Sequence, residues 1–294
     1  MNANDIISDA LRLIGELGEG ETVSGSDYTL CLRQLNMMVK TWMVEGIKLW
    51  CETEATVYLD KDTQSYILPT ANSTSSEVKT ELSAALVATN TVLTVDSTTG
   101  MTASDVVGVV QDSGAMHWST ISSVDSSTQI TIADGLVSAA AVDNHVYAYT
   151  DAMVRPKDIL SVRAENEGGS VTVLSKMARD DYFKLNNRSA SGIPRSWYFD
   201  RQRDNGTLYT YPVSTTGMDR LRITFTREIQ DFDASTDTPD FAPEWAQALV
   251  WNLGVEISPF FDREEKATKF ASKAAEIKYT LMNWDSEHTS LKIR

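Results

Sequence analysis

The sequence predicts an α+β fold with a helical bundle formed by helices from both ends of the chain, a β-rich core region, and an inserted small β-barrel or β-sandwich domain. Three observations predict it. Apolar residues recur at helical spacing near both ends. They alternate with polar residues in the middle of the chain, and the composition changes abruptly between residues 77 and 150. We therefore expect a core of residues 1–76 and 151–294, an inserted all-β domain at 77–150, and a C-terminal arm at 285–294.

Two helices are expected near the start, at residues 4–17 and 27–45. The apolar residues of the first lie at helical spacing: Ile6, Ile7, Ala10, Leu11, Leu13, Ile14 and Leu17. Asn2 or Asn4 can cap its first turn, and we expect Gly18 and Gly20 to end it. The second helix has an apolar face that includes Trp42, and Gly46 is its expected stop.

Two further helices are expected at residues 243–257 and 262–284. Pro243 suits a first helical turn, because the amide hydrogen that proline lacks would be unpaired there. Asp262 and Glu265 have the spacing of a capping box for the second helix. Together with Trp42, the predicted helical core consists of Trp245, Leu249, Leu253 and Ile257, which recur every four residues, and of Phe270, Ile277 and Leu281. Trp284 lies at the end of the same apolar stripe.

Period-two alternation predicts strands in residues 53–68 and 155–228. In the first region a turn at residues 60–62 predicts a hairpin that ends at Pro69. Between residues 77 and 150, Thr, Ser, Val, Ala and Asp dominate, and Lys79 is the only basic residue. Short alternating runs at 91–95, 106–111, 118–124, 129–132 and 145–149 indicate a small β-barrel or β-sandwich.

The charge pattern is acidic, with a net charge of −15. Residues 70–149 carry 8 acidic and 1 basic side chains, whereas residues 262–294 carry 6 and 7. Tight binding of nucleic acid through phosphates requires clustered Lys and Arg, so this balance argues against it. The start of the chain lacks the pattern of a signal peptide, and no stretch reaches the length of a membrane span. We expect Cys31 and Cys51 to be reduced core thiols of a protein made in a cytoplasm.

No pattern of catalytic residues is visible. His117, His145 and His288 are not at metal-ligand spacing from a cysteine or from each other, which disfavours a zinc site. Asp180 and Asp181 point about 100° apart on a helix, so they are expected to stabilise its first turn rather than share a substrate atom. The chain also lacks the common hydrolase and nucleotide-binding motifs. We therefore expect no enzyme activity and no cofactor.

Aromatic and basic side chains are frequent in the second β region. The aromatic ones are Trp197, Tyr198, Phe199, Tyr209 and Tyr211, and they suit core and inter-subunit packing better than the stacking of sugars or bases. The arginines near them are Arg195, Arg201, Arg203, Arg220, Arg222 and Arg227, and nearby acids nearly balance their charge. Ion pairs at a subunit boundary explain that balance better than DNA binding does.

Several segments together resemble one protein family. Residues 243–254 read Pro-Glu-Trp-Ala-Gln-Ala-Leu-Val-Trp-Asn-Leu-Gly, a Pro-Phe-Phe corner follows at 259–261, and an Ala/Lys helix ends in Asn-Trp-Asp at 283–285. Near the start of the chain, residues 10–15 read Ala-Leu-Arg-Leu-Ile-Gly. These segments, with the strands between them, resemble the head-to-tail adaptor proteins of podovirus-type tailed phages, also called tail accessory or head completion proteins. The resemblance covers about 220 of the 294 residues in the same order.

The resemblance implies a structural protein of the virion neck, made in the host cytoplasm. Such proteins form a ring, expected to be dodecameric, beneath the portal. There they close the DNA-filled head and provide the platform for the tail. The implied partners are the portal protein, a tail protein (nozzle or tail hub) and other copies of the chain. Genomic DNA would pass through the channel during ejection without specific binding, and no membrane is involved. In an alternative interpretation, the β insert binds carbohydrate or a capsid surface as part of a tail fibre or decoration protein.

The last residues are the predicted docking arm. Leu291, Lys292, Ile293 and Arg294 alternate apolar and basic side chains, which suits addition to a partner's strand or groove. Together with Trp284, they are the residues expected to dock on the portal. The helical core around Trp245 is expected to support this assembly.

Overall fold

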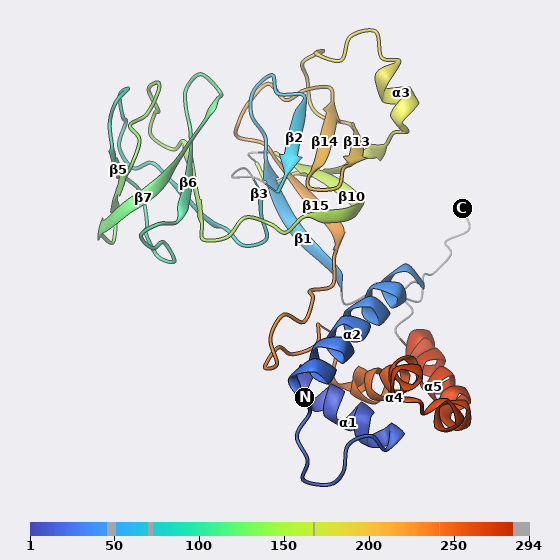
Figure 1. Cartoon of the computed structure of the whole chain (residues 1–294). Coiled ribbons are helices and arrows are strands. Elements are labelled where there is room, and N and C mark those ends of the chain that lie inside the picture. Colours follow the sequence, from blue (N-terminus) through green and yellow to red (C-terminus); the bar gives the residue numbers. More distant parts are fainter. Residues whose placement is uncertain (46–50, 70–72, 167, 241, 285–294) are drawn as a thin grey trace. The chain divides into compact units, whose positions relative to one another are not determined.

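The computed structural model confirms the mixed α+β class, with helices and several β-sheets (Figure 1). It describes residues 1–45, 51–69, 73–166, 168–240 and 242–284. The chain divides into two compact units. One contains Met1–Cys51 and Ile229–Arg294, and the other contains Glu52–Glu228. Residues 77–150 belong to the second unit together with the strands that flank them in sequence, so their boundaries as an inserted domain stay a prediction.

The first helix of the helical unit, α1, spans Ala3–Ile14. Asn2 caps it in a capping box, in which the Asp5 amide donates to the Asn2 side chain and the Asn2 amide donates to the Asp5 carboxylate. The expected end at Gly18 is wrong by about one turn. Gly15 ends the helix with φ 74°, a left-handed conformation that glycine adopts without a steric penalty.

The other helices of this unit are α2 (Gly25–Glu45), α4 (Ala246–Ile257) and α5 (Glu264–Trp284). A 3₁₀ turn, η2 (Pro243–Trp245), leads into α4, and another, η3 (Ser258–Phe261), separates α4 from α5. Asp262 does not open α5. It ends η3 with φ 52°, and α5 begins two residues later. Buried side chains of α1, α2 and α4 form one hydrophobic core, and α5 packs its Phe270, Ile277 and Leu281 against it.

Two of the three sheets of the β unit enclose a common core. One has the order β11-β10-β15-β1-β3, and the other has the order β12-β13-β14-β2. The strands of the first are β1 (Glu52–Tyr58), β3 (Ser73–Thr74), β10 (Pro156–Glu165), β11 (Val171–Val173) and β15 (Arg220–Arg227). The strands of the second are β2 (Ser65–Leu68), β12 (Ser175–Lys176), β13 (Ser196–Arg201) and β14 (Gly206–Tyr211). A short helix, α3 (Arg179–Phe183), joins β12 to β13.

The expected hairpin between the first two strands is wrong. Strand β1 pairs with β15 and β3, whereas β2 pairs with β14 in the other sheet. Val57 of β1 and Leu68 of β2 are both buried in the core that the two sheets share. Because each strand buries its own apolar face, the chain crosses between layers at residues 59–64 instead of folding back within one sheet.

The third sheet has six strands in the order β4-β9-β6-β7-β8-β5 (Figure 1). Their bounds are β4 Val78–Glu81, β5 Val92–Thr94, β6 Val106–Val110, β7 Met116–Ser126, β8 Gln129–Ile132 and β9 His145–Tyr149. The Ser83 amide donates to the Thr94 carbonyl and the Asp96 amide to the Glu81 carbonyl, both at 3.0 Å. These bonds join the ends of β4 and β5, so the sheet closes on itself around a separate apolar core.

Candidate assembly surfaces

The predicted helical core residues lie inside the helical unit. Trp245, Leu249, Leu253 and Ile257 are fully buried, and Trp42 is 3% exposed. The rings of Trp42 and Trp245 lie 5.9 Å apart between centroids. Any effect of these side chains on assembly would therefore act through the position of the helices. The side chain of Trp284 and residues Leu291, Lys292, Ile293 and Arg294 lie outside the described part of the chain.

A cluster of ion pairs connects the closed sheet with the outer face of the five-stranded sheet. Arg220 and Arg222 project from β15, Glu165 from β10, and Glu77 precedes β4. Arg220 lies 2.9 Å from Glu77 and 2.7 Å from Glu165, and Arg222 lies 2.8 Å and 2.9 Å from the same carboxylates. The hydrogen bond from Arg220 holds the pKa of Glu165 below its ordinary value, although partial burial acts in the opposite direction.

Aromatic rings surround this cluster. The Tyr58 hydroxyl donates to Glu77 at 2.7 Å, and its ring centroid lies 4.6 Å from that of Tyr147 and 5.3 Å from that of Trp118. Burial raises the pKa of Tyr58 well above its usual range. Gly108 faces Trp118 across the β6–β7 pair, and an added Cβ would lie 2.6 Å from the indole ring. Packed aromatic rings and shielded ion pairs therefore fix the closed sheet to the sandwich, which is our name for the two sheets that share a core.

Three of the six arginines that the sequence singles out form well-defined ion pairs within the chain. Arg220 and Arg222 bind Glu77 and Glu165, and Arg201 lies 2.8 Å from Asp158. The ion pairs of these three arginines form within one chain, and the expectation of ion pairs at a subunit boundary stays a prediction. Trp197, Tyr198 and Phe199 are buried, as core packing requires.

The carboxylates that complete this cluster are not identified by sequence reasoning. Glu77 lies at the edge of a polar linker, and Glu165 follows an ordinary alternating strand. Their one sequence signal is the alternation Arg220-Leu-Arg222, which places two guanidinium groups on one face of a strand and requires acids on the neighbouring strands.

One short segment forms an open edge of both sandwich sheets. Among the strands that the structure describes, β11 (residues 171–173) pairs with β10 alone, and β12 (residues 175–176) pairs with β13 alone. Leu174 between them is buried, whereas Val171 is 55% and Val173 is 71% exposed. We call residues 171–176 the open edge. Sheet edges that remain free are usually protected by charge, proline or a covering segment, and Val171 and Val173 provide none of these.

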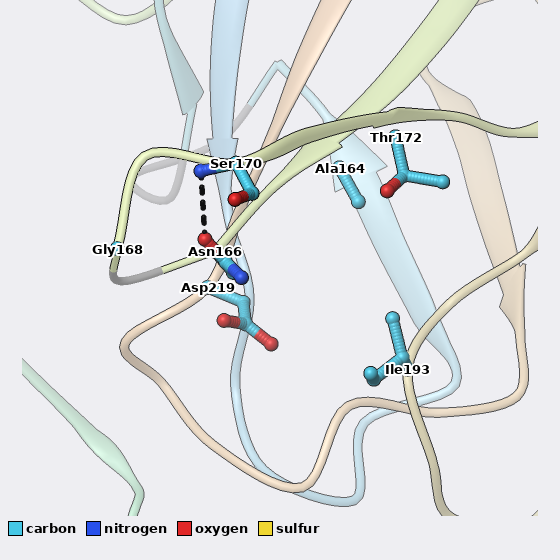
Figure 2. A pocket seen from close by; sticks show the side chains of 7 residues that line it. All are labelled: Ala164, Asn166, Gly168, Ser170, Thr172, Ile193 and Asp219. Carbon is cyan, nitrogen blue, oxygen red and sulfur yellow. Dashed lines mark hydrogen bonds between the residues drawn. The ribbon is translucent and has the colours of Figure 1, made fainter.

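A pocket of about 370 Å³ lies beside the open edge (Figure 2). Its described lining residues are Ala164, Asn166, Gly168, Ser170, Thr172, Ile193 and Asp219. The Asn166 side chain accepts a hydrogen bond from the Ser170 amide at 2.8 Å, and Ile193 is 65% exposed. Asp219 is the only titratable side chain among these residues, so they do not form an acid–base pair. Ala164 and Ile193 are the two apolar residues of this otherwise polar lining.

The described residues contain no group of His, Cys, Asp and Glu that is suited to hold a metal ion. Within the same part of the chain, no helix combines the length and hydropathy needed to cross a bilayer.

An exposed sheet edge is a surface to which another chain can add a strand. The chain matches the SU10 adaptor protein family over residues 1–290 and belongs to this family of phage adaptors. It is therefore a phage structural adaptor and a component of the virion. The family is one of structural proteins and not of known enzymes. No curated protein matches the chain.

Proposed function

We propose that the chain forms a ring beneath the portal of a short-tailed phage, where it closes the DNA-filled head and provides the attachment platform for the tail. The observation that carries this proposal is the family match over residues 1–290, which includes both units. The expected ring is dodecameric, and the expected partners are the portal protein above and a nozzle or hub protein of the tail below.

The open edge supports a contact between neighbouring copies. In a closed ring each subunit uses two different surfaces, one for each neighbour. Its strand β11, which is uncharged and has two exposed valines, is suited to be one of them, because it offers unpaired backbone groups and apolar area together. We assign this edge to the next copy of the chain.

The acidic charge supports assembly on a template. Each copy carries −15, so free copies repel one another, and a portal that binds them can offset this repulsion. The isolated protein should be monomeric or weakly associated at about micromolar concentration. The arm at 285–294, with Leu291 and Ile293 as its apolar side chains, is the proposed contact with the portal.

Negative-stain microscopy and sedimentation of the purified chain, with and without the portal protein of the same phage, test this function. Rings that appear on the portal support it. If the chain never binds portal and instead decorates capsids or binds glycans, the alternative interpretation of a decoration or fibre module replaces it. Stable rings without portal would contradict the template requirement alone.

A further inference from the structure

The short helix α3 and the loop after it hold an exposed aromatic ring between two arginines. Phe183 is 42% exposed, and the guanidinium groups of Arg179 and Arg188 lie 5.6 Å and 5.4 Å from the centre of its ring. An arginine that lies over an aromatic face can still direct its N–H groups to carboxylates. Arg179 donates to Asp200 at 3.2 Å, whereas Arg188 has no carboxylate partner among the described residues. We call Arg179, Phe183 and Arg188 the α3 clamp.

The α3 clamp is supported by aromatic rings on the face of the β12-β13-β14-β2 sheet that points away from the shared core. Tyr182 of α3 is 1% exposed, and its ring centroid lies 6.0 Å from that of Tyr198 on β13 and 5.0 Å from that of Tyr209 on β14. The Phe183 ring lies 6.1 Å and 6.0 Å from the same two rings. A side chain that is already ordered loses less conformational entropy when it binds a partner.

The closed sheet carries exposed apolar side chains on its outside. Leu86 and Ala140 exchange two backbone hydrogen bonds, of 2.8 Å and 3.0 Å, and their side chains are buried in the core of this sheet. The register places Val87 and Val137 diagonally opposite each other, and they are 66% and 77% exposed. Exposed apolar side chains that lie together often mark a contact surface. We call residues 86–90 and 136–140 the valine ribbon.

Carboxylates flank the valine ribbon. Asp134 precedes its second segment and Asp143 follows it, and both are exposed. Residues 80–154 contain 8 acidic side chains and no Lys or Arg. Residues 176–195, which include the α3 clamp, carry 5 basic and 2 acidic side chains. The two surfaces therefore complement each other in charge, and each of them adds exposed apolar side chains.

We propose that the α3 clamp of one copy binds the valine ribbon of the next copy. Phe183 packs against the two exposed valines, and the arginines face the flanking carboxylates. This contact rests on the proposed function, because a ring requires each copy to offer a different surface to each neighbour. Both surfaces are exposed in the single chain, so they do not cover each other within it. The clamp begins three residues after the open edge and therefore extends the surface that we assign to the next copy.

Photo-cross-linking in the full-length protein tests this contact. A photoreactive phenylalanine derivative replaces Phe183, and in the control protein it replaces Phe260, which is 51% exposed on η3. Two isotopically distinct forms of each protein are mixed, so peptide mapping separates adducts between chains from adducts within one chain. We expect at least about fivefold more adduct between chains from position 183 to residues 86–90 or 134–143 than from position 260.

The adducts are measured in two preparations. One contains the chain with portal protein. The other contains the free chain at about 1 mM and low salt, where even weak contacts are populated although the net charge of each copy opposes them. Equal adducts from both probes, adducts confined to single chains, or adducts that join position 183 to portal protein or to added duplex DNA would overturn the proposal.

Variants of the two surfaces identify the contact. Arg188→Glu and Val137→Asp should each lower the adduct between chains from position 183 at least about fivefold, because each places a carboxylate where the contact requires a cation or an apolar side chain. Arg203→Glu and Val124→Asp are the matched controls, since both side chains are exposed outside the two surfaces, and they should leave the adduct unchanged. Circular dichroism confirms that each variant is folded. An adduct that survives both surface variants would also contradict the proposal.

The two preparations separate this inference from the proposed function. Rings on portal that give the adduct between chains support both. An adduct between free chains that form no rings on portal leaves the contact valid and refutes the proposed function. Rings on portal without the adduct refute only the contact, and the absence of both rings and adduct refutes both.

Discussion

Arg220 lies 2.9 Å from Glu77, and this ion pair connects β15 of the sandwich to the residue that precedes β4 of the closed sheet. Both side chains are mostly shielded, with 13% and 12% of their surface exposed. Breaking a shielded pair costs more free energy than breaking a surface pair, because the charge that is left alone would be poorly solvated. This ion pair, in addition to the covalent connection, therefore attaches the closed sheet to the two sheets that share a core.

Replacing Arg220 with Ala should destabilise the β unit by about 2–4 kcal/mol, because Glu77 and Glu165 would share the remaining Arg222. Urea unfolding at neutral pH measures this change. Arg203→Ala is the matched control, because that side chain is 96% exposed and its ion pair with Asp204 is long, at 3.9 Å. It should change stability by less than about 0.5 kcal/mol. Equal effects of both variants would show that the cluster does not anchor the closed sheet.

The same cluster predicts an acid-sensitive contribution to stability. Arg220 lowers the pKa of Glu165 in the folded chain below the unfolded value of about 4.3. The ionised carboxylate therefore contributes stability above that value, and the contribution is lost as the pH falls through the lower folded pKa. Glu165→Gln should be less stable than the natural chain at neutral pH, and the difference should shrink below about pH 4. Urea unfolding across this range checks it, and a difference independent of pH would contradict it.

Val173→Lys should prevent or weaken rings on portal while leaving the monomer folded. The side chain is 71% exposed, so the monomer should lose less than about 0.5 kcal/mol, but a charge on the open edge opposes strand pairing with a neighbour. Val124→Lys on β7, at a side chain that is 38% exposed, is the control and should assemble normally. Ring yields from negative-stain images compare the two. If Val173→Lys forms rings as well as the natural chain, the subunit contact lies elsewhere.

The chain should show no measurable affinity for double-stranded DNA at physiological salt. Arg201, Arg220 and Arg222 are engaged by carboxylates of the same chain, so these three guanidinium groups are not free to bind phosphates. Charges act on DNA only within about 8 Å at this ionic strength, and the acidic excess repels it. Fluorescence anisotropy with a labelled duplex measures this. Micromolar binding that weakens steeply with added salt would show that basic side chains line the DNA path.

Helices and strand positions were predictable because burial imposes a clear period on the sequence. Leu249, Leu253 and Ile257 appear every four residues because one face of α4 is buried. Five of the six strands of the closed sheet were placed within a few residues for the same reason, whereas β4 (Val78–Glu81) was missed. The end of α1 was misplaced because Gly15, Gly18 and Gly20 are all compatible with a helix end, and only backbone geometry selects among them.

Strand pairing and ion pairing were less predictable, since both depend on partners distant in the sequence. Tyr66 and Leu68 look like the return strand of a hairpin, but their burial against the opposite sheet decides their pairing. Arg220 meets Glu77, which lies 143 residues away. No local pattern links them. The open edge was not predicted at all, because exposed valines on a short strand resemble core valines in sequence.

Removing residues 286–294 should leave a folded, soluble monomer that no longer assembles on portal. The helical unit keeps α5 up to Trp284, so its core should be unaffected. Burial of Leu291 and Ile293 contributes only about 3–6 kcal/mol before ordering costs, so one arm alone binds poorly. Many arms on one ring act together, which makes their joint loss large. Sedimentation of the truncated protein with portal checks this, and Leu291→Asp with Ile293→Asp in the full chain is the matched variant. If both still form rings with unchanged yield, portal docking belongs to another surface, and the helices around Trp245 become the next candidates.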